Sequence, residues 1–143
     1  MTASPDPVYR FEFDVPASAL DENGHVNNVQ YVQWMQDVAV RHFSLLGGTA
    51  SMRDMRATWV VHSHQVEYLA PAFLGERIQV RTWVADVRRV RSLRRYEFLR
   101  LADNKLLVRG ATEWVFVHAG TGRPLAIPDE VVRILPLLPD GLS

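Results

Sequence analysis

The sequence predicts an α+β domain in which one long helix packs against a single antiparallel sheet of five to six strands. Three observations lead to this class. The segment 8–15 alternates apolar and polar residues, a helical spacing of apolar residues begins at residue 29, and four strand-like runs follow the helix. Because one helix cannot cover both faces of such a sheet, we expect it to lie on the concave face.

The first strand is predicted by the stretch VYRFEFDV, residues 8–15. Its apolar side chains are Tyr9, Phe11, Phe13 and Val15, and the polar residues between them are Arg10, Glu12 and Asp14. A period of two is typical of a strand that places one face against a core and the other in solvent. The chain therefore begins its domain with a half-buried strand.

The long helix is predicted by a change in the spacing of apolar residues. The residues that recur at intervals of three and four are Val29, Val32, Met35 or Gln36, Ala39, Phe43 and Leu46. Asn27 and Asn28 precede them as good N-terminal caps. Two glycines, at 47 and 48, follow where a left-handed turn can end the helix. Both limits of the helix are therefore marked.

Four further strands are predicted at 57–69, 76–87, 92–102 and 105–117, since these runs are rich in Val, Trp, Tyr, Phe and Leu. Short connections join them, and the pair Asp103 and Asn104 suits a hairpin turn. Strands joined by such short connections are expected to pair antiparallel, because parallel pairing would need longer crossovers. The final segment, PLLPDGLS, is expected to be a frayed end.

Composition narrows the function classes. The chain has 143 residues, of which 48% are hydrophobic and 22% charged, which suits one packed domain. Basic and acidic residues balance at 16 each, so we expect neither nucleic acid nor a membrane as partner. The absence of cysteine excludes disulfides, thiolate metal sites and cysteine nucleophiles. The sequence shows no signal peptide or membrane span, and a cytoplasmic location is expected.

The polar stretch DENGHVNNVQY, residues 21–31, stands directly before the helix. Asp, Asn and Gly favour turns and caps, so one hypothesis is a helix start and nothing more. The other hypothesis is an active site. Free backbone N–H groups and the positive end of the helix dipole would then face a developing oxyanion.

The motif D-x-x-G-H-V-N-N-x-x-Y resembles that of the acyl-CoA thioesterases in the 4-hydroxybenzoyl-CoA thioesterase-like group. Its residues here are Asp21, Gly24, His25, Val26, Asn27, Asn28 and Tyr31. The likeness continues through VEYLAPAFLGERIQV and TGRPLAIP. The resemblance implies the hot-dog fold in one domain, 1–143, with a core at about 8–128 and a C-terminal tail, 129–143.

The resemblance also implies roles for the motif in hydrolysis of acyl-CoA or acyl-carrier thioesters. Asp21 would act as a nucleophile through an anhydride or as general base on water, and the sequence leaves both open. The backbone N–H of Asn28 would bind the oxyanion, and Gly24 would permit a positive φ and leave room for the thioester. Coenzyme A would be part of the substrate, so no separate cofactor is expected.

Three further residues of the motif are candidate substrate contacts, and each has a structural alternative. His25 could equally orient the loop through a hydrogen bond. Asn27 could cap the helix, a role that is compatible with holding the N–H groups in place. Tyr31 is more typical of the core or of a pocket wall.

An arginine cluster, RRVRSLRR, occupies the second predicted hairpin and contains Arg88, Arg89, Arg91, Arg94 and Arg95. One interpretation is a solvated strand end. Nucleic acid is disfavoured because no aromatic residues are interleaved and the net charge is zero. The third interpretation assigns Arg88, Arg89 and Arg91 to the phosphates of coenzyme A, since guanidinium groups suit phosphate.

The sequence also bears on three alternatives to thioester hydrolysis, which are a metal site, a hydratase and a non-catalytic binding protein. His62 and His64 are two apart on a strand and would share a face, but no third ligand is evident and no metal is predicted. A hot-dog hydratase or dehydratase would carry D-x-N-P-x-H, whereas Gly24 stands where the proline would be. A non-catalytic acyl-CoA binding protein is the remaining alternative, although Asp21 argues against it.

A single sheet around one helix leaves apolar surface and at least one open strand edge. We therefore expect a homodimer or a dimer of dimers, with the site at the subunit boundary.

Overall fold

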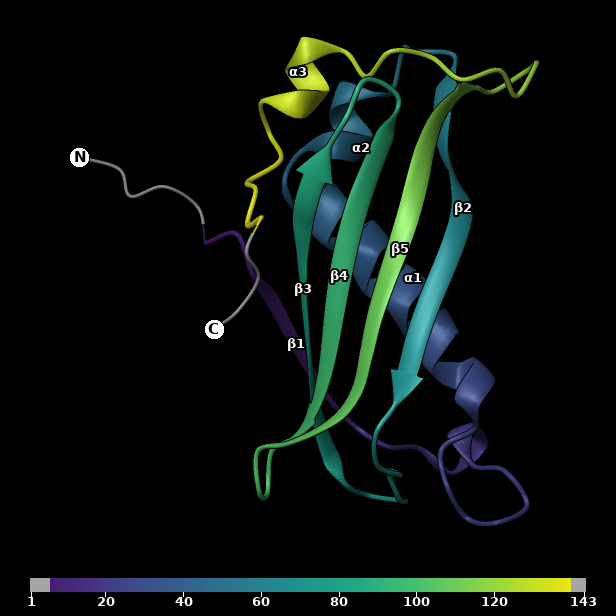
Figure 1. Cartoon of the computed structure of the whole chain (residues 1–143), viewed down its shortest axis with the longest axis vertical. Coiled ribbons are helices and arrows are strands. Elements are labelled where there is room, and N and C mark those ends of the chain that lie inside the picture. Colours follow the sequence, from purple (N-terminus) through teal and green to yellow (C-terminus); the bar gives the residue numbers. More distant parts are fainter. Residues whose placement is uncertain (1–5, 140–143) are drawn as a thin grey trace.

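The structure, a computed structural model, describes residues 6–139 and contains one five-stranded antiparallel sheet with a long helix packed against it (Figure 1). The strands are β1 (Tyr9–Asp14), β2 (Ala57–Tyr68), β3 (Arg77–Val87), β4 (Arg91–Arg100) and β5 (Lys105–His118). Their order across the sheet is β1-β3-β4-β5-β2. The predicted fold class is therefore confirmed, with five strands.

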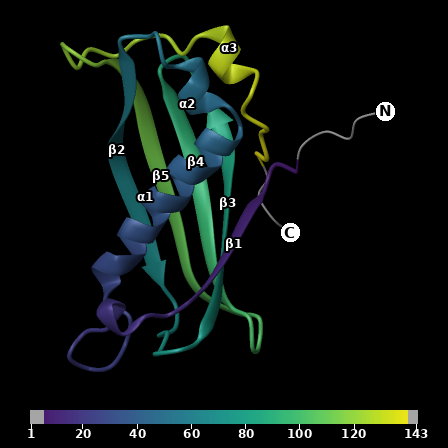
Figure 2. The ribbon, with the colours of Figure 1, turned by 180° about the vertical axis from the view of Figure 1, so that it is seen from behind.

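Helix α1 (Asn28–Leu45) crosses one face of the sheet obliquely (Figure 2). Its buried residues are Tyr31, Met35, Val38, Ala39 and His42. Val29, predicted to belong to the buried stripe, is 73% exposed, because the stripe that faces the sheet begins at Tyr31 instead. No helix within residues 6–139 has both the length and the apolar character that crossing a bilayer requires.

The main core lies between α1 and the sheet, where Met35, Tyr96 and Phe98 are fully buried. The hairpins β3–β4 and β4–β5 form as predicted, and Asn104 takes the left-handed conformation (φ 54°) in the second turn. Asn tolerates this conformation better than most residues do.

A β-bulge in β2 changes which side chains share a face. The pairing of β2 with β5 shifts between Val61 and Ser63, so His62 is the extra residue. His64 then lies on the half-buried side and His62 is exposed. The prediction that the two histidines face the same side was wrong, because the bulge inverts the alternation.

The remaining short helices are η1 (Ala17–Ala19), α2 (Gly48–Ser51) and α3 (Asp129–Val132). Val131 of α3 is buried, and the Leu138 N–H donates to the Val84 carbonyl at 2.9 Å. Residues 136–139 therefore dock beside β3, and the prediction of a frayed end was wrong for them. The rest of that predicted end, 140–143, lies outside the described residues.

Candidate active site

The loop before α1 is closed by Asp21. Its backbone N–H donates to the His25 carbonyl at 2.7 Å. Its carboxylate Oδ1 accepts the N–H groups of Asn23 at 2.9 Å and His25 at 3.2 Å. Within residues 6–139 no hydrogen bond engages Oδ2. Asp21 thus performs the turn-closing role of the simpler hypothesis and still has one oxygen available for chemistry.

Gly24 lies at the outer part of this loop with a φ of 78°. A Cβ added there would meet no atom within 4 Å. The positive φ predicted as a possibility is therefore present, and the space beside the backbone is open. Any other residue would be strained by its own backbone rather than by a neighbour.

The first turn of α1 is capped by Asn27, whose Oδ1 accepts the Val29 N–H at 3.0 Å. The Asn27 carbonyl accepts the Gln30 N–H at 2.9 Å. The N–H of Asn28 has no acceptor among the described residues, and Asn28 is exposed. No acidic residue occupies this turn. The N–H that the resemblance assigned to the oxyanion is thus free, at the positive end of an 18-residue helix.

The loop is supported by the β2–β3 connection. The Val26 N–H donates to the Ala72 carbonyl at 2.9 Å, and the His25 ring meets the Phe73 ring edge-on with centroids 5.1 Å apart. His25 therefore has a structural contact, and sequence alone did not indicate that Phe73 would provide it.

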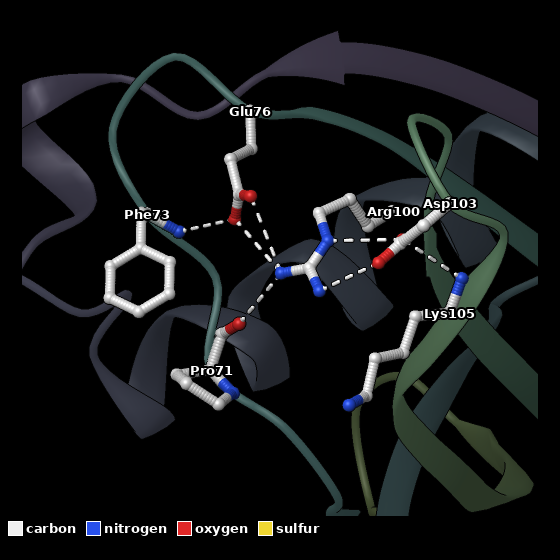
Figure 3. Close-up of polar contacts among 6 residues, drawn as sticks. All are labelled: Pro71, Phe73, Glu76, Arg100, Asp103 and Lys105. Carbon is white, nitrogen blue, oxygen red and sulfur yellow. Dashed lines mark hydrogen bonds and ion pairs between the residues drawn. The ribbon is translucent and has the colours of Figure 1, made fainter.

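Arg100 holds the β2–β3 connection to the β4–β5 turn (Figure 3). Its guanidinium lies 3.3 Å from Glu76 Oε2 and 3.0 Å from Asp103 Oδ2. Glu76 in turn accepts the Phe73 N–H at 2.8 Å. Arg100 therefore supports Phe73, which contacts His25. The sequence carries no local signal for this chain of contacts, because it joins segments that are distant along the chain.

Two tyrosines lie near the start of α1, Tyr31 within the helix and Tyr68 at the end of β2. Tyr31 is 2% exposed, and its hydroxyl has no hydrogen-bond partner in the described chain. Burial raises the pKa of Tyr31 to about 12, so the phenol stays neutral. The Tyr68 hydroxyl donates to the Asn28 carbonyl at 2.9 Å. Tyr31 is thus a core residue below the site, and Tyr68 is a site residue that sequence reasoning missed.

Exposed apolar side chains occur on the same segments. They are Val29, Tyr68, Leu69, Phe73 and Leu74, each at least 42% exposed. Apolar residues gathered in this way are typical of a surface that a partner or ligand covers.

The predicted phosphate-binding arginines lie far from this loop. The β3–β4 turn is at the opposite end of the sheet from the start of α1 (Figure 1). Arg88 pairs with Asp86 at 2.9 Å, Arg91 pairs with Glu113, and Arg89 is exposed. Within one chain, the structure does not bring these arginines to Asp21.

Arg94, counted with the solvated cluster, is only 4% exposed, and for this residue the solvated-end interpretation was wrong. The alternation of β4 explains its burial, because Arg94 shares the inward face with Tyr96 and Phe98.

The sequence of this chain is similar to those of known proteins. Residues 15–135 match the family described as the Thioesterase-like superfamily. The chloroplast palmitoyl-acyl carrier protein thioesterase of Cuphea hookeriana is 24% identical over 131 residues, which cover 87% of this chain and 32% of that protein. The chain therefore spans about a third of the length of its curated relatives.

Solved structures give the same picture of the fold. The DHNA-CoA thioesterase from Staphylococcus aureus is 25% identical with a TM-score of 0.76, covering 83% of this chain and 80% of that one. A hypothetical protein from Staphylococcus aureus, solved in complex with CoA, is 18% identical with a TM-score of 0.82, covering 94% of this chain and 85% of that one.

Proposed function

Because the chain belongs to the thioesterase-like superfamily, we propose that it hydrolyses acyl thioesters to a free acid and a thiol. The observation that carries the proposal is the free N–H of Asn28 at the start of α1, next to the loop that Asp21 closes. The narrower likeness to the 4-hydroxybenzoyl-CoA thioesterase-like group belongs to the same proposal and rests on the motif between Asp21 and Tyr31.

In the proposed reaction the thioester carbonyl oxygen accepts a hydrogen bond from the Asn28 N–H. As the carbonyl carbon is attacked, negative charge moves onto this oxygen, where the N–H and the helix dipole stabilise it. The dipole is fixed before reaction, so it needs no reorganisation when the charge appears.

Asp21 supplies the attack by one of two routes. As a general base it removes a proton from water while the water oxygen attacks the carbonyl carbon. As a nucleophile it forms an acyl anhydride, which water then hydrolyses. In both routes the C–S bond breaks, the thiolate leaves, and the water supplies the oxygen and proton that complete the acid and the thiol.

The proposed substrate is an acyl-CoA or an acyl-carrier protein conjugate. The relatives support both acyl carriers, because one is named for an acyl-carrier protein substrate and another for a CoA thioester. With coenzyme A as part of the substrate, the proposed reaction needs no further cofactor.

The test is a hydrolysis screen with acetyl-CoA, palmitoyl-CoA, benzoyl-CoA and a palmitoyl-acyl carrier protein. Thiol release can be followed with a disulfide reagent, since the chain has no cysteine to react with it. We expect turnover of at least one substrate. Binding of acyl-CoA without turnover would identify a non-catalytic binding protein. A parallel assay with an enoyl-CoA covers the other alternative, because hydration without thiol release would identify a hydratase.

A further inference from the structure

Arg94 is a buried cation that has no counter-ion among residues 6–139. Its Nη1 donates to His42 Nδ1 at 2.9 Å and to Thr82 Oγ1 at 3.1 Å. No carboxylate of residues 6–139 forms an ion pair with it, and the only cation over an aromatic ring in that range is Arg41. A buried charge left without a partner is strongly unfavourable.

The contacts of Arg94 do not remove its charge. Burial, assisted by the charge of Arg94, lowers the pKa of His42 to about 4, so this imidazole is neutral and its Nδ1 accepts the hydrogen bond from Arg94. Burial lowers the pKa of Arg94 to about 10, which leaves it protonated at neutral pH. A hydroxyl and a neutral imidazole therefore surround a full positive charge.

A cavity of about 90 Å³ lies against Arg94, between the second half of α1 and the sheet. Its walls include Phe43, Trp59, Trp114 and Leu135, and Val40, which is 61% exposed, lies at its solvent side. Within the described chain, the hydrogen bonds of Arg94 all use Nη1, so the rest of the guanidinium fork has no protein partner. The site thus combines free charged donors with apolar walls.

From this arrangement we propose that the Arg94 cavity binds a short-chain carboxylate. The carboxylate would accept hydrogen bonds from the guanidinium, whose planar fork matches its two oxygens. The apolar stem would contact the indole rings of Trp59 and Trp114. One guanidinium balances one negative charge, whereas a phosphate dianion would lack further donors.

The cavity has room for a small ligand. The cavity opens to solvent beside Val40, and its volume of about 90 Å³ is enough to seat a small carboxylate such as acetate or propionate against Arg94. The cavity residue Ala39 also lies roughly 16 Å along α1 from Asn28. Met35 and Val38 are buried positions of α1 that lie between Asn28 and Ala39 along the helix. The proposal therefore does not depend on the proposed thioesterase activity.

The test compares sodium propionate, its neutral analogue propionamide, and sodium chloride at equal ionic strength, by calorimetric titration and thermal unfolding. We expect saturable binding of propionate to wild type and no comparable binding of propionamide or chloride. Arg94→Met should bind propionate at least about tenfold more weakly, because a charge-assisted hydrogen bond is lost. Arg95→Met is the matched control, since Arg95 is the exposed neighbour on the same strand.

The comparison of propionate with propionamide needs only wild-type protein, so it remains decisive if Arg94→Met fails to fold. Arg94→Lys gives a second variant that keeps the charge and loses the fork. Equal effects of propionate and chloride on wild type would overturn the proposal, as would an Arg94→Met protein that binds propionate as tightly as wild type.

Discussion

The hydroxyl of Tyr68 donates a hydrogen bond of 2.9 Å to the carbonyl oxygen of Asn28. Tyr68 ends β2 and Asn28 begins α1, so one contact joins the edge of the sheet to the start of the helix. The same asparagine carries the free N–H proposed to bind the oxyanion. An edge strand therefore fixes the position of the proposed oxyanion donor.

Tyr68→Phe should lower turnover roughly three- to tenfold and the free energy of unfolding by about 1 kcal/mol or less. The variant removes the hydrogen bond and keeps the ring beside Tyr31, 5.8 Å between centroids. Tyr9→Phe is the control, because no hydrogen bond of the Tyr9 hydroxyl occurs in the described chain. Steady-state kinetics and urea unfolding measure both effects, and unchanged turnover in Tyr68→Phe would remove this contact from the mechanism.

Asp21→Asn should lower the turnover of thioester hydrolysis by at least about a hundredfold, because an amide is neither a base nor an effective nucleophile. The fold should persist, since the amide oxygen can still accept the N–H groups of Asn23 and His25. Circular dichroism and gel filtration verify the fold.

Glu22→Gln is the matched control for Asp21→Asn, because Glu22 is the exposed carboxylate next in the chain. It should leave turnover unchanged. If both variants retained wild-type turnover, Asp21 would only close the turn.

The strands and the helix could be predicted because their periodicity is local. The strand predicted at 8–15 is observed as Tyr9–Asp14, and the helix predicted from residue 29 begins at Asn28. The bulge after Val61 could not be predicted, since a strand with an extra residue has the same kinds of residue as a regular strand. The burial of Arg94 was open to prediction, because strict alternation along β4 places it beside Tyr96.

The candidate site was predictable only where it is contiguous in sequence. Asp21, Gly24 and Asn28 lie in one motif, and the local turn chemistry that they need can be read from it. Tyr68 and Arg100 act on this loop from other strands. Their side chains become relevant only after the sheet has formed, so no local pattern indicates them.

The stability of the protein should fall as the pH is lowered from about 6.5 toward 4, in part through His42. Its pKa is lowered from 6.5 to about 4 in the folded state, mainly by burial. In this range the unfolded chain binds a proton that the folded chain excludes, so acid favours unfolding. The loss attributable to His42 is up to about 3 kcal/mol, fully recovered above pH 6.5.

The measurement is urea unfolding of wild type and His42→Gln between about pH 5 and 6.5, where most carboxylates have finished titrating. A glutamine oxygen can still accept the Arg94 hydrogen bond of 2.9 Å but does not titrate. The variant should show the flatter dependence on pH, and equal slopes would exclude His42 as the cause.

The chain should form a homodimer or a dimer of dimers. Within the described residues, β2 pairs only with β5, so one edge of a 12-residue strand is open. The exposed apolar side chains of Tyr68 and Leu69 lie at the end of this edge. Open edges of this kind are rarely left unpaired. Sedimentation should find dimers or tetramers at micromolar concentration, whereas a stable monomer would contradict this prediction.

The arginines at the β3–β4 turn should contribute to substrate binding rather than to the chemical step. Arg88, Arg89 and Arg91 lie at the end of the sheet opposite the start of α1, so in a dimer we expect them to serve the partner's substrate. Contacts with coenzyme A phosphates are made about equally in ground and transition states, so they affect the Michaelis constant and not turnover. Replacing all three with alanine should therefore raise the Michaelis constant for acyl-CoA and leave turnover nearly unchanged.

An acyl-pantetheine substrate provides the control, because it lacks those phosphates. The triple variant should hydrolyse it as well as wild type does, and added salt should weaken acyl-CoA binding more in wild type than in the variant. Arg95→Ala should behave as wild type. If the triple variant lost activity toward both substrates in proportion, the cluster would support the structure, since Arg91 also pairs with Glu113. If activity toward neither substrate fell, the turn would be a solvated strand end.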